Sequence, residues 1–272
     1  MGLANLRAKG YRVVEASNLR RRDGFLAGTD AERAAGYREL LADPAVDAIF
    51  FARGGYGAAR ILSLVDPDEL RSHPKIHLGG SDLTALFAFA SRRASLVTFY
   101  GPMVAVQMAE HTPLDWEPVL TGETVPQVEL PAPDRLAPGV GEGPLVGGCL
   151  SIVASLCGTP EAGIAAGSVF FWEDVGEEIY RLDRMLTQLE RSGTFDRLEA
   201  MVIGTIAPGL AGAESPDAVR AWLTDRFAGS PFPVAMGLPA GHRPDTRTIP
   251  LGARVRVDAD GGTLQFLEAG VL

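Results

Sequence analysis

Ser81 and Asp82 stand at a sharp corner of the sequence, and their types suit covalent chemistry on a carbonyl group. Two glycines precede them in GGSDLTALF, between a strand-like run and a helix-like run. A serine at such a corner could simply cap the helix, or it could stand exposed on a strained turn as a nucleophile. A serine nucleophile also needs a base, and the base needs an acid that orients it.

Four histidines are available for the role of base. His73 lies in a charged loop, and His77 lies in the middle of a strand, where its side chain is expected to pack. His111 lies in a polar stretch. His242 lies in GLPAGHRP, a loop whose glycines and prolines can hold a side chain in place and leave it accessible. The sequence therefore favours His242 as the base, against the alternative of a plain surface histidine.

Two carboxylates, Glu173 and Asp174, end the apolar run VFFWEDV. Functional side chains often lie where a rigid strand gives way to a loop. A buried carboxylate at that point could accept a hydrogen bond from a histidine Nδ1–H and stabilise the imidazolium. The alternative is that Asp174 and Glu177 cap the helix that follows. The local pattern leaves both interpretations open.

A glycine-rich turn, ARGGYGAAR, follows a buried strand and opens a helix. Ligands of α/β proteins usually bind at such strand ends. The turn lacks the third glycine of a dinucleotide fingerprint, and the sequence has no Walker pattern, so a nucleotide site is weakly supported. Gly54 and Gly55 could instead expose backbone N–H groups as an oxyanion hole, or the turn could serve packing alone.

Strand-like and helix-like segments alternate through the first half, which predicts an α/β fold with a parallel, Rossmann-like N-terminal domain at residues 1–115. Proline and glycine gather at residues 116–145, which indicates a linker or crossing segment. Residues 146–272 are expected to form a smaller, mixed α/β domain that carries the acid and the base. The expected helices lie at 2–9, 30–42 (capped by Asp30), 58–65, 83–93, 150–156, 179–191 and 216–227, and the main expected strands at 11–16, 47–52, 75–78, 96–100, 169–172 and 200–204.

Composition narrows the classes of function. The chain has 272 residues, 46% of them hydrophobic, and a formal net charge of -9 with no basic stripe, so nucleic acid is not an expected partner. No apolar run is long enough to span a membrane and no signal-peptide core opens the chain, so a cytoplasmic protein is expected. Cys149 and Cys157 are interpreted as buried thiols, and no metal or cofactor is expected.

Six stretches, taken together and in order, resemble one family. They are ARGGYGAARIL (52–62), GGSDLTAL (79–86), YGPM (100–103), GGCLSIVASLCGTP (147–160), WEDVGEEIYRLDRMLTQL (172–189) and GLPAGHRPDTRTIPLG (237–252). The chain resembles the LD-carboxypeptidases, a serine peptidase family that includes murein tetrapeptide carboxypeptidases and microcin C immunity hydrolases. This resemblance implies that Ser81 is the nucleophile, Glu173 the acid and His242 the base.

The resemblance also implies an oxyanion hole made by the backbone N–H groups of Gly55, Gly54 and Asp82. A carboxypeptidase needs a cation for the free carboxylate of its substrate. Arg53 is the candidate because a guanidinium pairs with a carboxylate through two hydrogen bonds, and the alternative is a structural salt bridge. Tyr56 is expected either to line the pocket or to pack the turn.

Three functions remain open at this point. The first is release of the terminal D-alanine from murein tetrapeptide by hydrolysis of an L,D-amide bond. The second is hydrolysis of a peptidyl or aminoacyl nucleotide, for which Trp172 or Tyr56 could stack on the base. The third is a non-catalytic module that binds a nucleotide or a peptide. The resemblance further implies a homodimer.

Two departures from the family are visible. The family usually opens with a strand that ends near the site, whereas this sequence opens on a helix, so a central strand is expected to be missing. The family also often has asparagine where this chain has Cys149, which removes an amide at the start of the helix there.

Overall fold

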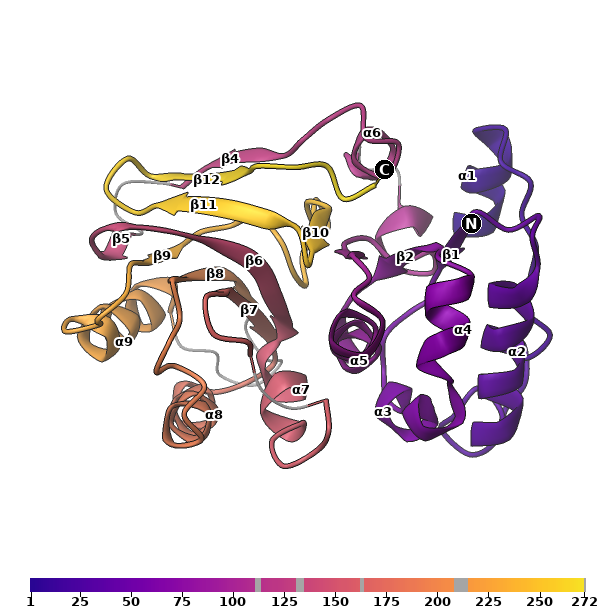
Figure 1. The fold of residues 1–272 in the computed structure, drawn as a ribbon, viewed down its shortest axis with the longest axis horizontal. Helices are drawn as coiled ribbons and strands as arrows, with labels where there is room; N and C mark the ends of the chain where they lie inside the picture. Colours follow the sequence, from indigo (N-terminus) through magenta and orange to yellow (C-terminus); the bar gives the residue numbers. More distant parts are fainter. Residues whose placement is uncertain (111–113, 131–134, 162–163, 208–214, 272) are drawn as a thin grey trace.

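The computed structural model describes residues 1–110, 114–130, 135–161, 164–207 and 215–271, which form two lobes (Figure 1). The α-helices are α1 (Gly2–Ala8), α2 (Asp30–Ala42), α3 (Ala58–Ile61), α4 (Pro67–Ser72), α5 (Thr84–Ala94), α6 (Trp116–Leu120), α7 (Leu150–Ser155), α8 (Ile179–Arg191) and α9 (Pro216–Phe227). Short 3₁₀ helices are η1 (Leu62–Leu64), η2 (Ser81–Leu83) and η3 (Gln107–Ala109). The strands are β1 (Ala48–Phe50), β2 (Ile76–Gly79), β3 (Thr98–Tyr100), β4 (Gln127–Glu129), β5 (Arg135–Ala137), β6 (Val140–Cys149), β7 (Val169–Val175), β8 (Ala200–Ala207), β9 (Val234–Met236), β10 (Ile249–Leu251), β11 (Arg254–Asp258) and β12 (Thr263–Phe266).

The first lobe contains a sheet with strand order β1-β2-β3-β10. Strands β1, β2 and β3 are parallel, as expected for strands joined through helices. Strand β10 comes from the last part of the chain and pairs antiparallel with β3, with Ile249 opposite Tyr100. The chain therefore returns to its first sheet after completing most of the second lobe.

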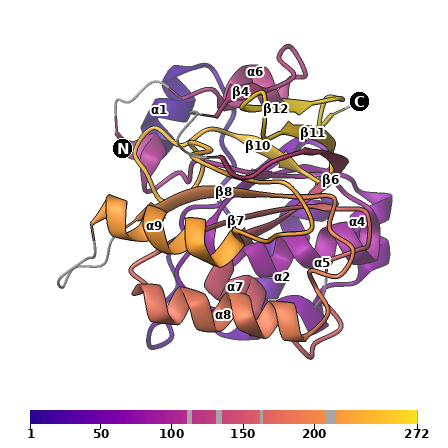
Figure 2. The same cartoon turned by 90° about the vertical axis from the view of Figure 1, so that its left-hand side faces the viewer.

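The second lobe contains a larger sheet with strand order β4-β12-β11-β6-β7-β8-β9-β5. Its centre, β6 to β9, is parallel, and its outer strands are antiparallel. Helices α8 and α9 lie against one face of this sheet (Figure 2). Strands β4 and β5, from the proline-rich segment, lie at opposite edges of the sheet. The predicted α/β class is confirmed. The first sheet departs from the predicted parallel arrangement at β10, and the C-terminal part carries the larger sheet although it was expected to be the smaller domain.

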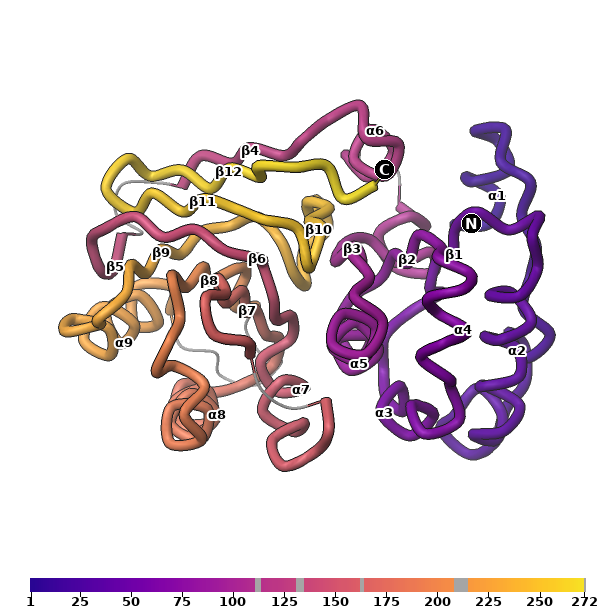
Figure 3. The backbone as a smooth tube through the Cα atoms, viewed as in Figure 1, coloured from indigo at the N-terminus to yellow at the C-terminus, as the bar shows by residue number. Residues whose placement is uncertain are grey.

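The two lobes share one hydrophobic core. Leu86 and Phe87 of α5 belong to the same buried cluster as Leu145 of β6 and Phe171 of β7. The end of the chain also returns to the first lobe beside α6 (Figure 3), where Val271 joins a cluster around the α6 residues. The strand ends of both lobes are therefore held at fixed positions relative to each other. No described helix has the length and apolar character needed to cross a membrane.

Two local predictions are wrong. The expected strand at residues 11–16 has no regular secondary structure and forms no β pairing. It lines a groove of about 980 Å³ whose other wall includes β1, so the backbone groups that could pair with it lie across the groove. Helix α2 is capped by Thr29 and not by Asp30, because Thr29 forms a capping box with Glu32. Helices α8 and α9 begin and end where the sequence predicts.

Candidate active site

Ser81 is the first residue of η2, which follows β2 after Gly80 and continues into α5. Its backbone has φ of 61°, in the left-handed region that non-glycine residues seldom adopt. A residue held there typically stores about 1–3 kcal/mol, and such strain is concentrated at functional sites. The Ser81 side chain is partly exposed. This geometry matches a nucleophile elbow, the functional alternative for the GGSD corner.

Glu173 and His242 form a hydrogen-bonded pair. Glu173 lies on β7 and is fully buried, and its Oε2 accepts from His242 Nδ1 at 2.8 Å and from His242 N–H at 3.0 Å. Gly241 makes this approach possible, because a Cβ at that position would lie 2.4 Å from Glu173 Oε2. With Nδ1 engaged in this way, Nε2 of His242 is left as the ring nitrogen that can take a proton.

The electrostatics of His242 fit a base. Burial lowers the pKa of His242, but the hydrogen bond to Glu173 and the charges of Glu173 and Asp174 outweigh this effect and hold the pKa above its ordinary value. The imidazolium that forms when the ring takes a proton is therefore stabilised at the site.

Tyr100, at the end of β3, connects the pair to Ser81. Its hydroxyl donates to Glu173 Oε1 at 2.6 Å and accepts from the Ser81 N–H at 2.8 Å. No hydrogen bond joins Ser81 Oγ to the His242 ring in the part of the chain that the structure describes. Catalytic hydrogen bonds of this kind often form fully only when substrate is bound. The structure thus brings Ser81, Glu173 and His242 into one network through Tyr100.

The glycine-rich turn packs directly on Ser81. A Cβ at Gly54 would lie 2.6 Å from Ser81 Cβ and 3.4 Å from Asp82 N, so only glycine fits there. The buried Asp82 carboxylate accepts from Ala58 N at 2.7 Å and fixes the end of the turn. Burial raises the pKa of Asp82, and the hydrogen bond from Ala58 opposes that rise. Asp82 therefore holds the turn against the elbow through its side chain.

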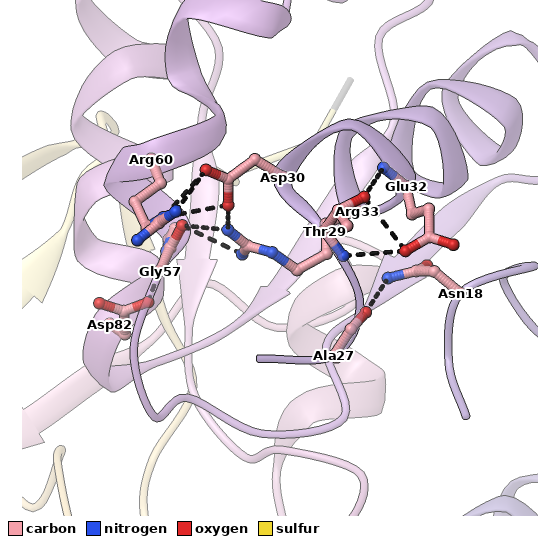
Figure 4. A network of polar contacts seen from close by, with 10 residues as sticks. Asn18, Ala27, Thr29, Asp30, Glu32, Arg33, Gly57, Arg60 and Asp82 are labelled. Atoms are coloured by element: carbon pink, nitrogen blue, oxygen red, sulfur yellow. Dashed lines mark hydrogen bonds and ion pairs between the residues drawn. The ribbon is translucent and has the colours of Figure 1, made fainter. Parts of the chain in front are cut away.

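A second network supports the same turn from the outer side (Figure 4). Arg33 of α2 donates to the Gly57 carbonyl from both terminal nitrogens, each at 3.0 Å. Asp30 accepts from Arg33 at 2.7 Å and pairs with Arg60 of α3 at 2.8 Å. The start of α2 and the start of α3 are thus tied together around the residues that follow Gly55.

Arg53 and Tyr56 both lie at the surface of this turn. Arg53 is exposed and forms no ion pair with any described residue, so the alternative of a structural salt bridge is not observed. Tyr56 is 61% exposed, and its ring lies 5.8 Å from that of Phe25, which is 80% exposed. Tyr56 does not pack inside the turn. The two rings form an exposed aromatic pair, which we call the Phe25–Tyr56 pair.

Comparison with known proteins agrees with this geometry. The profile of the LD-carboxypeptidase N-terminal domain matches residues 1–101, and that of the LD-carboxypeptidase C-terminal domain matches residues 142–257. A Streptomyces coelicolor protein assigned as a carboxypeptidase is 41% identical over 93% of this chain and 82% of its own length. The chain belongs to the LD-carboxypeptidase family.

Two further relatives show the range of this family. A probable murein peptide carboxypeptidase of Bacillus subtilis is 33% identical over 96% of this chain and 84% of its own length. A structure of MccF in complex with glutamyl sulfamoyl guanosine superposes with a TM-score of 0.87 at 25% identity, covering 100% of this chain and 90% of that chain. This chain therefore has the same fold as the solved MccF structure over its whole length.

Two interpretations of side chains near the site are corrected by the structure. Trp172 cannot offer a stacking surface, because it is fully buried and its Nε1–H donates to Met201 Sδ at 3.3 Å. Asp174 does not cap the helix after it. Its carboxylate accepts from Ser151 N at 2.7 Å and so caps α7. Cys149, the residue at the N-cap position of α7, forms no capping hydrogen bond through its own side chain.

Among the described residues, His73, His77 and Cys157 form no hydrogen bond to Ser81, Glu173 or His242. His77 is buried against Tyr37, whose hydroxyl lies 2.8 Å from His77 Nε2. His73 ends α4, and His111 lies outside the described residues. Both cysteines are free thiols, with Cys149 buried and Cys157 only partly buried, so the expectation of two buried thiols is half right.

Sequence reasoning missed Tyr100 and Thr84 as members of the site region. Thr84 Oγ1 accepts from Cys149 N at 3.0 Å and joins the elbow helix to the start of α7. Tyr100 falls within the family stretch YGPM and at the end of an expected strand, and this position could have identified it as a site residue.

Proposed function

We propose that this protein is a serine carboxypeptidase that hydrolyses an amide between an L- and a D-configured centre, releasing the terminal D-alanine of murein tetrapeptide. The observation that carries the proposal is the buried Glu173–His242 pair, linked to a strained serine at an elbow, in a chain of the LD-carboxypeptidase family. A probable murein peptide carboxypeptidase among its relatives supports the substrate.

In the proposed reaction Ser81 Oγ attacks the carbonyl carbon, and Nε2 of His242 takes the hydroxyl proton. Glu173 holds Nδ1–H and stabilises the imidazolium. The oxyanion accepts hydrogen bonds from the N–H groups of Gly55 and Asp82, with Gly54 as a further donor, each worth about 3 kcal/mol of barrier. His242 then gives its proton to the leaving amino group of D-alanine. Water, activated by His242, releases the acyl group from Ser81.

Arg53 is proposed to bind the free carboxylate of the substrate. Its guanidinium is exposed, unpaired among the described residues, and adjacent to the turn that packs on Ser81. A tetrapeptide that ends in an amide should therefore be a poor substrate. Arg53→Ala should raise KM for the free acid about 10-fold, as expected for loss of a charge-assisted hydrogen bond. An unchanged KM would remove Arg53 from this role.

A second candidate is hydrolysis of an aminoacyl or peptidyl nucleotide. The Phe25–Tyr56 pair favours it, because exposed aromatic rings beside the elbow could stack on a base. A related structure, of MccF, holds glutamyl sulfamoyl guanosine. Comparing kcat/KM for the tetrapeptide and for an aminoacyl adenylate decides between the two substrates.

The central experiment is mass spectrometry after incubation with L-Ala–D-Glu–meso-diaminopimelate–D-Ala. Wild type should release one alanine and Ser81→Ala should not. Ser95→Ala is a matched control, because Ser95 is the other described non-glycine residue with positive φ and ends α5 far along the chain from the elbow. Turnover by Ser81→Ala would refute the assignment of the nucleophile, and a binding module would show no turnover in any variant.

We also propose that the enzyme works as a cytoplasmic homodimer in peptidoglycan recycling, and that the chain divides into domains around residues 116–145. Two unpaired cysteines are typical of a reducing compartment. The segment that we take as the division carries strands of the second sheet. Light scattering on the purified protein tests the dimer.

A further inference from the structure

The Tyr100 hydroxyl contacts the acid and the nucleophile at the same time. It lies 2.6 Å from Glu173 Oε1 and 2.8 Å from Ser81 N. Tyr100 comes from β3 of the first lobe, and Glu173 comes from β7 of the second lobe. One oxygen atom thus joins the two lobes at the point where the proposed reaction takes place.

The direction of both hydrogen bonds is fixed by chemistry. Burial, and then the charge of Glu173, raise the pKa of Tyr100 well above its ordinary value, so the hydroxyl keeps its proton. An ionised carboxylate can only accept, so that proton goes to Glu173 Oε1. A lone pair of the same oxygen accepts the N–H of Ser81. This N–H is therefore engaged and is not available to an oxyanion.

The hydroxyl is also rigidly placed. Tyr100 is 2% exposed, and its ring packs edge-on against Phe171 with centroids 5.5 Å apart at 72°. Its backbone is paired on one side with Gly79 of β2 and on the other with Ile249 of β10. The ring therefore cannot follow a displaced carboxylate or a displaced serine.

We propose that Tyr100 is a positioning residue of the catalytic machinery, which orients Glu173 through Oε1 and holds the strained backbone of Ser81 through its N–H. This inference rests on the proposed function of the site. Tyr100 does not contact the reacting atoms. It acts through the acid and through the backbone of the nucleophile.

The state of His242 reports this role directly. Besides Glu173, the charged group that acts on His242 is Asp174. Cys149 and Tyr100 both interact with Glu173, and burial raises the pKa of each and keeps it neutral. Without the Tyr100 hydroxyl, Glu173 accepts hydrogen bonds from His242 alone, so its negative charge is less neutralised by other donors. The imidazolium is then stabilised more strongly, so the pKa of His242 should rise.

Tyr100→Phe tests the proposal, with Tyr37→Phe as the matched control. Tyr37 is also a buried tyrosine of the first lobe, and its hydroxyl bonds to His77 instead of the site. In Tyr100→Phe we expect kcat to fall about 10- to 100-fold, as for loss of a hydrogen bond to a charged group, while KM stays nearly unchanged. Tyr37→Phe should keep the kcat of wild type. NMR titration of the His242 ring should show a higher pKa in Tyr100→Phe only.

The proposal is overturned if Tyr100→Phe matches Tyr37→Phe in kcat and in the pKa of His242, or if that pKa falls. The NMR titration needs no substrate, so it decides the role of Tyr100 even if wild type cleaves none of the peptides, an outcome that would refute the proposed function alone. If Tyr100→Phe does not fold, the wild-type Tyr100 hydroxyl proton resonance should move as His242 titrates, and a fixed resonance would overturn the proposal.

Discussion

Replacing Glu173 with glutamine should nearly abolish turnover while leaving the fold intact. The two side chains have the same shape, and Glu173 is fully buried, so no cavity forms. The change therefore acts on the negative charge at this position and on its hydrogen bonds. Both carboxylate oxygens accept in the wild-type protein, Oε2 from two N–H groups of His242 and Oε1 from the Tyr100 hydroxyl.

The magnitude follows from counting donors. A glutamine amide has one accepting oxygen and one donating NH₂ group, so it cannot accept on both sides. If NH₂ faces His242, the backbone N–H of His242 loses its acceptor and Nδ1 must accept, so the ring proton moves to Nε2, the atom that should take the proton of Ser81. Loss of the charged partner costs about 1.5–3 kcal/mol. The wrong tautomer brings the total to about 5 kcal/mol, or about 10⁴-fold in kcat.

The assay is D-alanine release from the tetrapeptide, with the His242 tautomer read by ¹⁵N NMR. Glu177→Gln is the matched control, since Glu177 lies four residues on and pairs with Arg181 at 3.7 Å rather than with His242. It should keep wild-type kcat. Activity of Glu173→Gln within about 10-fold of wild type, or an unchanged tautomer, would refute the reasoning from donor count.

Two further predictions concern packing and pH. Gly54→Ala should lower kcat/KM about 100-fold, because its Cβ would meet Ser81 Cβ at 2.6 Å and displace the nucleophile. Gly229→Ala, with open space around its Cβ, should keep full activity, and equal rates for the two variants would contradict the clash. Burial lowers the pKa of His77 from 6.5 to about 4. The folded state, in which the ring is neutral, is therefore fully stable above pH 6.5. As the pH falls from 6.5 towards 4, the free energy of unfolding should decrease by about 3 kcal/mol. Thermal unfolding across that range measures the loss, and a His77→Gln variant with an equally steep acid limb would argue against it.

The residues that the sequence identifies well are those whose signal is local. Ser81 follows two glycines at a strand-to-helix corner, and His242 stands in a loop made rigid by glycine and proline. Glu173 ends an apolar strand, where a carboxylate is conspicuous. Each signal lies within a few neighbouring residues. The structure brings all three into one hydrogen-bonded network.

The residues that the sequence misjudges depend on distant partners. Tyr100 contacts a carboxylate 73 positions away, and Asp174 caps α7 by accepting from Ser151, 23 positions before it. No local pattern encodes either contact. Trp172 suggests a stacking surface by its type, but its strand lies at the centre of a sheet covered on both faces, so its ring is buried. The stretch at 11–16 has the composition of a strand but faces a groove in place of a neighbouring strand.

The return of β10 to the first sheet restricts how His242 can move. The loop that carries His242 leaves β9 in the second sheet and enters β10 in the first, so it is anchored in both lobes. Any hinge opening between the lobes would stretch this loop and pull Nδ1 away from Glu173. If the lobes separated during unfolding, activity would therefore be lost before the lobes themselves unfolded. Because the lobes share a core and β10 crosses between them, the rate of the proposed reaction should report whether the two lobes are closed.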